Sequence, residues 1–172
     1  MNAAQPQAAN GAGVNEITKL ADNTIKFHAV LNGIQTLTTV MIKNIPMRFS
    51  QQDLLHMIQQ RHAETFDYFY LPMDLKTRYN RGYAYINFTD PLFILDFYLE
   101  FQGLRWNERF KDCHSTKQCS LFYANVQGKE KNIAQLQDKN IMKKLEDDVK
   151  PVIYDTKVPD PAEIRRIKQY YA

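Results

Sequence analysis

The most informative segment of the chain is RGYAYINF at residues 81–88. Alternate residues of a β-strand project from opposite faces of a sheet, so one face would carry Arg81, Tyr83 and Tyr85. The other face would carry small or apolar side chains, those of Ala84, Ile86 and Phe88. The pattern predicts a strand with one face packed on a core and the other face wet.

The octamer also fills every position of the RNP-one signature, which is basic, Gly, aromatic, small, aromatic, aliphatic, any residue, aromatic. On the wet face, Tyr83 and Tyr85 would form a platform on which unpaired RNA bases stack, with Arg81 contacting a phosphate at its edge. Gly82 would let backbone or ligand approach closely where a side chain would block it. The alternative is an ordinary buried strand, because aromatic alternation is common in sheets.

A companion strand lies upstream at residues 40–45, with the sequence VMIKNI. Its alternation places Val40 and Ile42 toward the core and Met41 and Lys43 beside the tyrosines. Met41 stands where this RNP-two strand usually carries an aromatic ring. A thioether is polarizable and can lie under a base, but it offers less than a ring. We therefore expect a weaker or narrower base-binding surface than a fully aromatic platform gives.

The order of the remaining signals predicts the fold. After a strand that begins at residue 38, a helix starts at Ser50, where Asp53 completes a capping-box-like start. The elements that follow are a strand at 66–71, the octamer strand, a helix opened by Asp90 and Pro91 and closed by Gly103, and a strand at 118–124. This β-α-β-β-α-β order predicts the α+β class, as a ferredoxin-like RNA-recognition motif with a four-stranded antiparallel sheet backed by two helices.

Two further aromatic rings are candidates for the RNA surface. Alternation in the last strand turns Ser120 and Phe122 outward. In the second strand, Asp67 suggests that the face it shares with Phe69 and Leu71 is the solvent face. We therefore expect Phe69 and Phe122 to extend the platform, and packing of these rings in the core or on an extension is the alternative.

Polar and basic residues outside the strands supply further candidate contacts. Asn125, Gln127 and Lys129 follow the last strand and would add polar contacts at the edge of the sheet, or would simply form the entry to a helix. The basic loops at 76–81 and 105–117 can contact phosphates, which positions RNA without reading its sequence.

The chain is expected to divide into a central motif with flanking segments. The ranges are a disordered tail at 1–15, an N-terminal extension at 16–37, the RNA-recognition motif at 38–127 and a C-terminal helical extension at 128–172. The tail is small and polar and cannot bury enough surface to order itself. In the C-terminal extension we expect a helix at 129–145 and a helical face at the end of the chain formed by Ile164, Ile167 and Tyr171.

The helix after Asp90 is apolar almost all round, whereas a helix packed on one side should show a stripe. Something beyond the sheet is expected to cover it. The candidates are the segment before residue 38 and the helix at 129–145, or else a protein partner that binds there.

Composition limits the class of protein. The formal net charge of +3 over 172 residues is lower than the charge of a strongly basic protein that coats duplexes.

Cys113 and Cys119 occur without a signal-peptide stretch or a membrane-length apolar run, so we expect free thiols, a nuclear or cytoplasmic location and no membrane. No metal or cofactor is expected, because CxxC spacing is absent.

Catalysis is not expected, and no catalytic residue is assigned. The sequence contains no nucleophile elbow, phosphate-cradling glycine loop or metal cluster of persuasive spacing. The four histidines are scattered, and His56 and His62 are expected at the surface, on or just after a helix.

Several blocks of sequence together resemble one known family. They are TTVMIKNIP at 38–46, FDYFYLP at 66–72, GYAYINF at 82–88, YANVQGK at 123–129 and KPVIYDT at 150–156. These blocks resemble the carboxy-terminal domain of Mei-two-like proteins, eukaryotic RNA-binding regulators named for a meiosis factor. Met41 agrees with the sequence pattern of that family. Arg81 stands where the family often has an apolar residue, and Tyr85 stands where it often has Phe. The resemblance implies an RNA-recognition fold, RNA binding and an intracellular regulatory role.

The sequence thus leads to two hypotheses. The first is a sequence-tolerant binder of single-stranded RNA, acting as a post-transcriptional or meiosis-type regulator. The second is a protein-interaction module of the same fold within a larger ribonucleoprotein assembly, with the partner bound through the second helix or the C-terminal extension.

Overall fold

The computed structural model describes residues 22–172. The expected tail at 1–15 and the first part of the N-terminal extension lie outside the described residues. The elements are α1 Phe27–Leu31, β1 Thr39–Lys43, α2 Gln51–His62, β2 Phe66–Tyr70, β3 Tyr83–Phe88, α3 Phe93–Phe101, α4 Trp106–Arg109, β4 Ser120–Tyr123, α5 Lys129–Asp138, the short 3-10 helices η1 Met142–Lys144 and η2 Asp147–Val149, β5 Val152–Ile153, and α6 Pro161–Tyr171.

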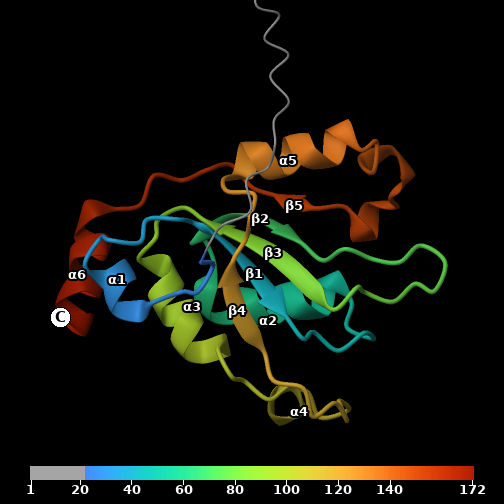
Figure 1. The fold of residues 1–172 in the computed structure, drawn as a ribbon, viewed down its shortest axis with the longest axis horizontal. Coiled ribbons are helices and arrows are strands. Elements are labelled where there is room, and N and C mark those ends of the chain that lie inside the picture. The colour runs from blue at the N-terminus through green and yellow to red at the C-terminus, as the bar shows by residue number, and fades with distance from the viewer. Residues whose placement is uncertain (1–21) are drawn as a thin grey trace, which may run out of the picture.

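The strands form one antiparallel sheet in the order β4-β1-β3-β2-β5 (Figure 1). The predicted β-α-β-β-α-β order is confirmed, with the two signature strands β1 and β3 as central neighbours. The fifth strand, β5, comes from the C-terminal extension and pairs with β2. At the opposite edge, Thr24 forms an isolated bridge with Phe122 of β4.

The main core lies between one face of the sheet and the helices α2 and α3. The predicted alternation places fully or nearly fully buried side chains there, those of Val40, Ile42, Ala84, Ile86, Phe88, Leu121 and Tyr123. Helix α2 starts where expected, because Ser50 and Asp53 complete a reciprocal capping box. Leu54 and Ile58 of α2 are 0% exposed and close the core from the helix side.

Helix α3 is covered by two segments from opposite ends of the chain. In Figure 1, α1 and α6 lie beside α3, away from the sheet. The Phe27 ring of α1 meets the Tyr171 ring of α6 edge to face with centroids 5.2 Å apart, and Ile164 and Ile167 pack on the same core. The segment before residue 38 is therefore part of the cover, as predicted, while Leu99 remains 59% exposed.

The C-terminal extension does not form the single helix expected at 129–145. Helix α5 ends at Asp138, Asn140 takes a positive φ of 52°, and the chain continues through η1 and η2. Instead of covering α3, this segment lies over the sheet (Figure 1). Within the described part of the chain, no helix has the length and apolar character needed to span a membrane.

Candidate nucleic-acid interface

The outer face of the sheet, which is turned away from α2 and α3, carries side chains in three rows that run across the strands. The middle row consists of residues paired across β4, β1, β3 and β2, namely Phe122, Met41, Tyr85 and Tyr70. Side chains directly opposite one another in antiparallel strands are within contact range. The two signature strands and Phe122 therefore form one continuous surface.

The next row contains Ser120, Lys43 and Tyr83, and it lies at the open end of this face. Lys43 Nζ lies 4.6 Å from the centroid of the Phe122 ring, a cation–π arrangement. The rings of Tyr83 and Tyr85 are 5.7 Å apart and meet edge to face at 69°. This end of the sheet thus presents two accessible tyrosines beside a thioether and a cation, with Arg81 exposed at the start of β3.

The third row, formed by Thr39, Asn87 and Tyr68, is buried. The Thr39 hydroxyl donates to Asn87 Oδ1 at 2.8 Å and accepts from the backbone N–H of Gly128, also at 2.8 Å. These hydrogen bonds attach the start of α5 to the sheet. The C-terminal extension therefore closes this end of the outer face and leaves the other end accessible.

The expectation that Phe69 lies on the outer face is wrong. A β-bulge at the start of β2 shifts the alternation, so that Tyr68 faces outward and Phe69 is 0% exposed in the core. Asp67 does not mark a solvent face, because its carboxylate is buried. It accepts hydrogen bonds from Asn87 Nδ2 at 2.8 Å and from the Thr156 hydroxyl at 2.6 Å.

Polar residues after the last strand form hydrogen bonds within the fold. Gln127 Oε1 accepts from the backbone N–H groups of residues 38–39, at 3.0 and 2.9 Å. Lys129 Nζ donates to the backbone carbonyl of Tyr154 at 3.0 Å, which joins α5 to the segment after β5. Asn125 is exposed. Gln127 and Lys129 are thus helix-entry residues with structural partners.

Gly82 is needed for its conformation more than for close approach. Its φ is 87°, in the region that favours glycine, whereas a Cβ built there would come no closer than 3.8 Å to the Ile45 carbonyl. The backbone N–H of Gly82 donates to Asn80 Oδ1 at 2.7 Å, and its carbonyl accepts from Ile45 N–H at 3.0 Å. These contacts fix the entry to β3 and so the position of Arg81.

Tyr68 and Tyr70 were missed as candidates for the outer face. They form a second core cluster with Leu136, Leu145 and Val149 of the C-terminal extension. Burial raises the pKa of Tyr68, Tyr70 and Tyr85, and the neighbouring tyrosines add to the effect. The signal in the sequence was the four aromatic residues of FDYFY, which place rings on both faces of the strand.

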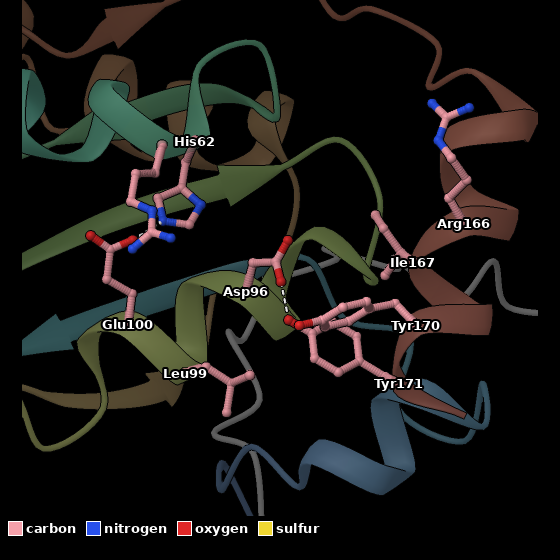
Figure 2. Close-up of a pocket in the computed structure, with 9 residues that line it drawn as sticks. His62, Asp96, Leu99, Glu100, Arg166, Ile167, Tyr170 and Tyr171 are labelled. Atoms are coloured by element: carbon pink, nitrogen blue, oxygen red, sulfur yellow. Dashed lines mark hydrogen bonds and ion pairs between the residues drawn. The ribbon is translucent and has the colours of Figure 1, made fainter.

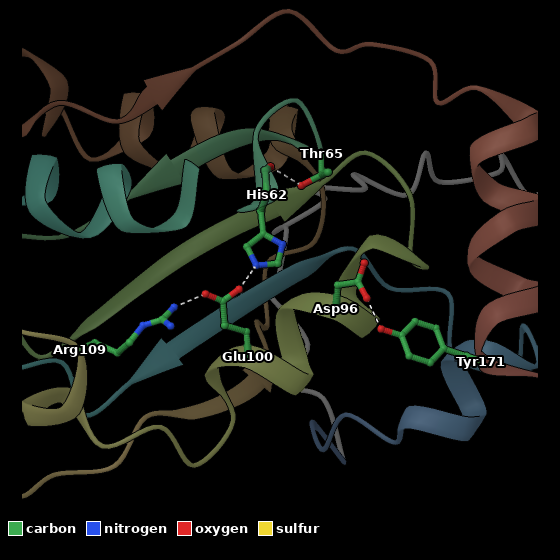
Figure 3. Close-up of polar contacts among 6 residues, drawn as sticks. All are labelled: His62, Thr65, Asp96, Glu100, Arg109 and Tyr171. Atoms are coloured by element: carbon green, nitrogen blue, oxygen red, sulfur yellow. Dashed lines mark hydrogen bonds and ion pairs between the residues drawn. The ribbon is translucent and has the colours of Figure 1, made fainter. Parts of the chain in front are cut away.

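A pocket of about 630 Å³ lies away from the outer face of the sheet, between α2, α3 and α6. Figure 2 shows Asp96, Leu99 and Glu100 of α3 across from Ile167, Tyr170 and Tyr171 of α6. Four polar residues of its wall, His62, Asp96, Glu100 and Tyr171, form internal contacts. The Tyr171 hydroxyl donates to Asp96, which joins α6 to α3 (Figure 3).

His62 is buried, contrary to the expectation of a surface histidine. Its Nε2 lies 2.6 Å from Glu100 Oε2, and the Arg109 guanidinium donates to the other oxygen of Glu100 (Figure 3). The His62 and Glu100 side chains are only 5% and 8% exposed. The carboxylate thus links α2, α3 and the end of α4, which is a structural use of these groups. His56, by contrast, is exposed as expected.

Both cysteines are free thiols in the structure. Burial raises the pKa of the Cys119 thiol, so it stays protonated and unreactive. Among residues 22–172, no three His, Cys, Asp or Glu side chains are grouped so that they could hold a metal ion.

The sheet, its two backing helices and its signature strands define an RNA-recognition-motif domain. A family model described as RNA recognition motif 2 matches residues 37–137. Protein MEI2-like 5 of Arabidopsis thaliana is 37% identical over 142 residues, which cover 83% of this chain and 17% of that protein. Meiosis protein mei2 of Schizosaccharomyces pombe is 40% identical over 120 residues, which cover 70% of this chain and 16% of that protein. The chain belongs to the RNA recognition motif 2 family, and its relatives are MEI2-like proteins.

The chain spans less than a fifth of the length of these two relatives. Among solved structures, a chain of the Sxl-lethal protein/RNA complex is similar with a TM-score of 0.40 and 19% identity. That similarity covers 51% of this chain and 47% of the solved one.

Proposed function

We propose that this chain binds single-stranded RNA through the open end of the outer face of its sheet. The observation that carries the proposal is the continuous row of Phe122, Met41 and Tyr85, with Tyr83 beside it. Bases would stack on the two tyrosine rings, with the Met41 thioether under an adjoining base. Arg81 and Lys43 would hold phosphates at the margins of this surface.

Membership of an RNA-recognition family supports RNA binding as the activity. The likeness to Meiosis protein mei2 supports a role in a regulatory process of the meiotic type. The mixture of stacking surfaces and cations favours sequence-tolerant recognition, because every base has a π-face and phosphates carry no sequence information.

The test is the affinity for a fluorescently labelled octauridylate, measured by anisotropy with wild type and Tyr83→Ala. Tyr83 is half-buried and belongs to neither hydrophobic core cluster, so its truncation should leave the fold intact. Loss of one stacking ring should weaken binding by about 5- to 150-fold, the equivalent of about 1–3 kcal/mol. Tyr170→Ala is the matched control, because Tyr170 is 81% exposed on α6, far from the sheet surface.

Affinity should also fall as salt rises, since phosphate contacts release counterions. Equal affinities of the wild-type and Tyr83→Ala proteins would contradict the platform. Failure of the wild-type protein to bind octauridylate at any salt concentration would contradict RNA binding by this face.

A further inference from the structure

A pocket of about 350 Å³ lies where the C-terminal extension overhangs the sheet. Tyrosines of β2 and β3 line its sheet side, and residues of α5 and η1 with their connecting turn line the opposite side. The residues on the extension side are Asn132, Gln135, Leu136, Lys139, Ile141, Lys144 and Leu145. The volume is at the lower end of the range of small-ligand sites, about 300–1,000 Å³. The pocket therefore has room for one small planar group between two walls.

The charge of this pocket suits an anion. Arg81, Lys139 and Lys144 line it, whereas no Asp or Glu does. None of these three cations takes part in the ion pairs formed within residues 22–172. Basic side chains outside these ion pairs, around a pocket with no carboxylate in its lining, match the phosphate of a nucleotide.

The pocket also offers polar groups to a ligand. Tyr68, Tyr70, Tyr83 and Tyr85 line it, and none of their hydroxyls forms a hydrogen bond with another described residue. The side-chain amide of Gln135 is equally without a hydrogen bond to the described part of the chain. Hydroxyl and amide groups both donate and accept, as recognition of the edge of a base requires.

We propose that this pocket binds one nucleotide of single-stranded RNA, with its base turned in between the sheet tyrosines and α5. Arg81, Lys139 and Lys144 hold the phosphate of that nucleotide, while neighbouring bases lie on the open part of the sheet. The inference rests on the proposed function, because Tyr83 and Tyr85 belong to both surfaces. It adds one partly enclosed position, at which the tyrosine hydroxyls and the Gln135 amide read the base.

The first test fills the pocket from the extension side. Gln135→Phe places a ring in it, and Gln137→Phe places the same ring on the exposed side of the same helix. With octauridylate as the probe, Gln135→Phe should weaken binding about fivefold or more, the effect of losing one stacked base. Gln137→Phe should bind as wild type does, and thermal unfolding by circular dichroism checks that both proteins are folded.

The second test changes charge without filling space. Lys139→Glu and Lys131→Glu alter the net charge equally and lie at exposed positions at the end and near the start of α5, so neither should unfold the protein. Only Lys139 lines the pocket. Lys139→Glu should therefore weaken octauridylate binding several-fold more than Lys131→Glu at the same salt concentration.

The outcomes separate this inference from the proposed function. Equal affinities within either pair of variants, with octauridylate still bound by wild type and weakened by Tyr83→Ala, would overturn the enclosed nucleotide and leave the open platform standing. Absence of binding by wild type would overturn the platform and the pocket together.

Discussion

The side chain of Gln127 satisfies both backbone polar groups of Thr39. Its Oε1 accepts from the Thr39 N–H at 2.9 Å, and its Nε2 donates to the Thr39 carbonyl at 2.9 Å. The same amide donates to the carbonyl of Ala124 at 2.8 Å. A glutamine that follows the last strand of the motif thus fixes the first residue of β1.

Replacing Gln127 by Ala should therefore lower stability and leave the RNA-binding face unchanged. Removing the amide leaves the backbone N–H groups of Thr38 and Thr39 without their acceptor, and Thr39 is 0% exposed, so a cost of about 1–3 kcal/mol is expected. Urea unfolding measures the loss, and Gln137→Ala, at an exposed position, is the control. Unchanged stability combined with weaker octauridylate binding would instead make Gln127 an RNA contact.

Asp67→Ala should loosen the C-terminal extension. The substitution leaves the buried Asn87 amide without its acceptor and removes the partner of Thr156, so a loss of about 1–3 kcal/mol is expected. Trypsin should then cleave after Lys157 faster than in wild type. Asp155→Ala, at an exposed neighbouring position, should change neither result. Unaltered proteolysis would mean that the segment is held without this carboxylate.

Glu100→Ala should destabilise the helix layer. It removes the carboxylate shared by His62 and Arg109, and breaking a buried pair costs about 3–5 kcal/mol. We expect a loss at the lower end of this range, because the Arg109 side chain is 35% exposed and water can hydrate it once Glu100 is removed. Glu108→Ala on α4 is the control. Octauridylate affinity should stay at the wild-type value at temperatures where the variant is folded, and a fall in affinity would connect the helix layer to the RNA face.

Stability should decline at alkaline pH. Burial raises the pKa of Tyr123 to about 12, whereas an unfolded tyrosine titrates near 10. The Tyr123 hydroxyl therefore loses its proton at a higher pH in the folded state than in the unfolded state. Its contribution to stability is complete below pH 10 and is lost as the pH rises through about 12. Urea unfolding across that window, with tyrosinate absorbance of native and unfolded protein, gives the measurement. The prediction would be wrong if the tyrosines titrated at the same pH in the native and the unfolded protein.

The sequence could predict the faces of β1, β3 and β4 because each strand has one face in the core and one face toward solvent or ligand. Strict alternation then identifies both faces, as it does for Met41 and Tyr85. The same argument failed for β2, where the bulge shifts the alternation and the extension buries the outward side. Phe69 and Tyr68 are both buried, so apolar character could not distinguish them.

The need for a cover on α3 was also evident from the sequence, but the identity of the whole cover was not. An apolar helix surface does not specify its partner, and both flanking segments contained suitable apolar residues. Strand β5 has only two residues, too few for a periodic pattern. The pocket under α5 depends on where the extension crosses the sheet, which is a tertiary property.

Thr24 and β5 lie at opposite edges of the sheet, one from each flank of the motif. An edge strand with free N–H and C=O groups is a template to which a strand of another molecule can add. Thr24 lies against β4, where Tyr123 N–H also donates to the Asn23 carbonyl at 2.8 Å, and Val152 and Ile153 occupy the edge of β2. Chains lacking either flank would expose such an edge and should aggregate as their concentration rises. The flanking segments thus block strand pairing between copies of this chain.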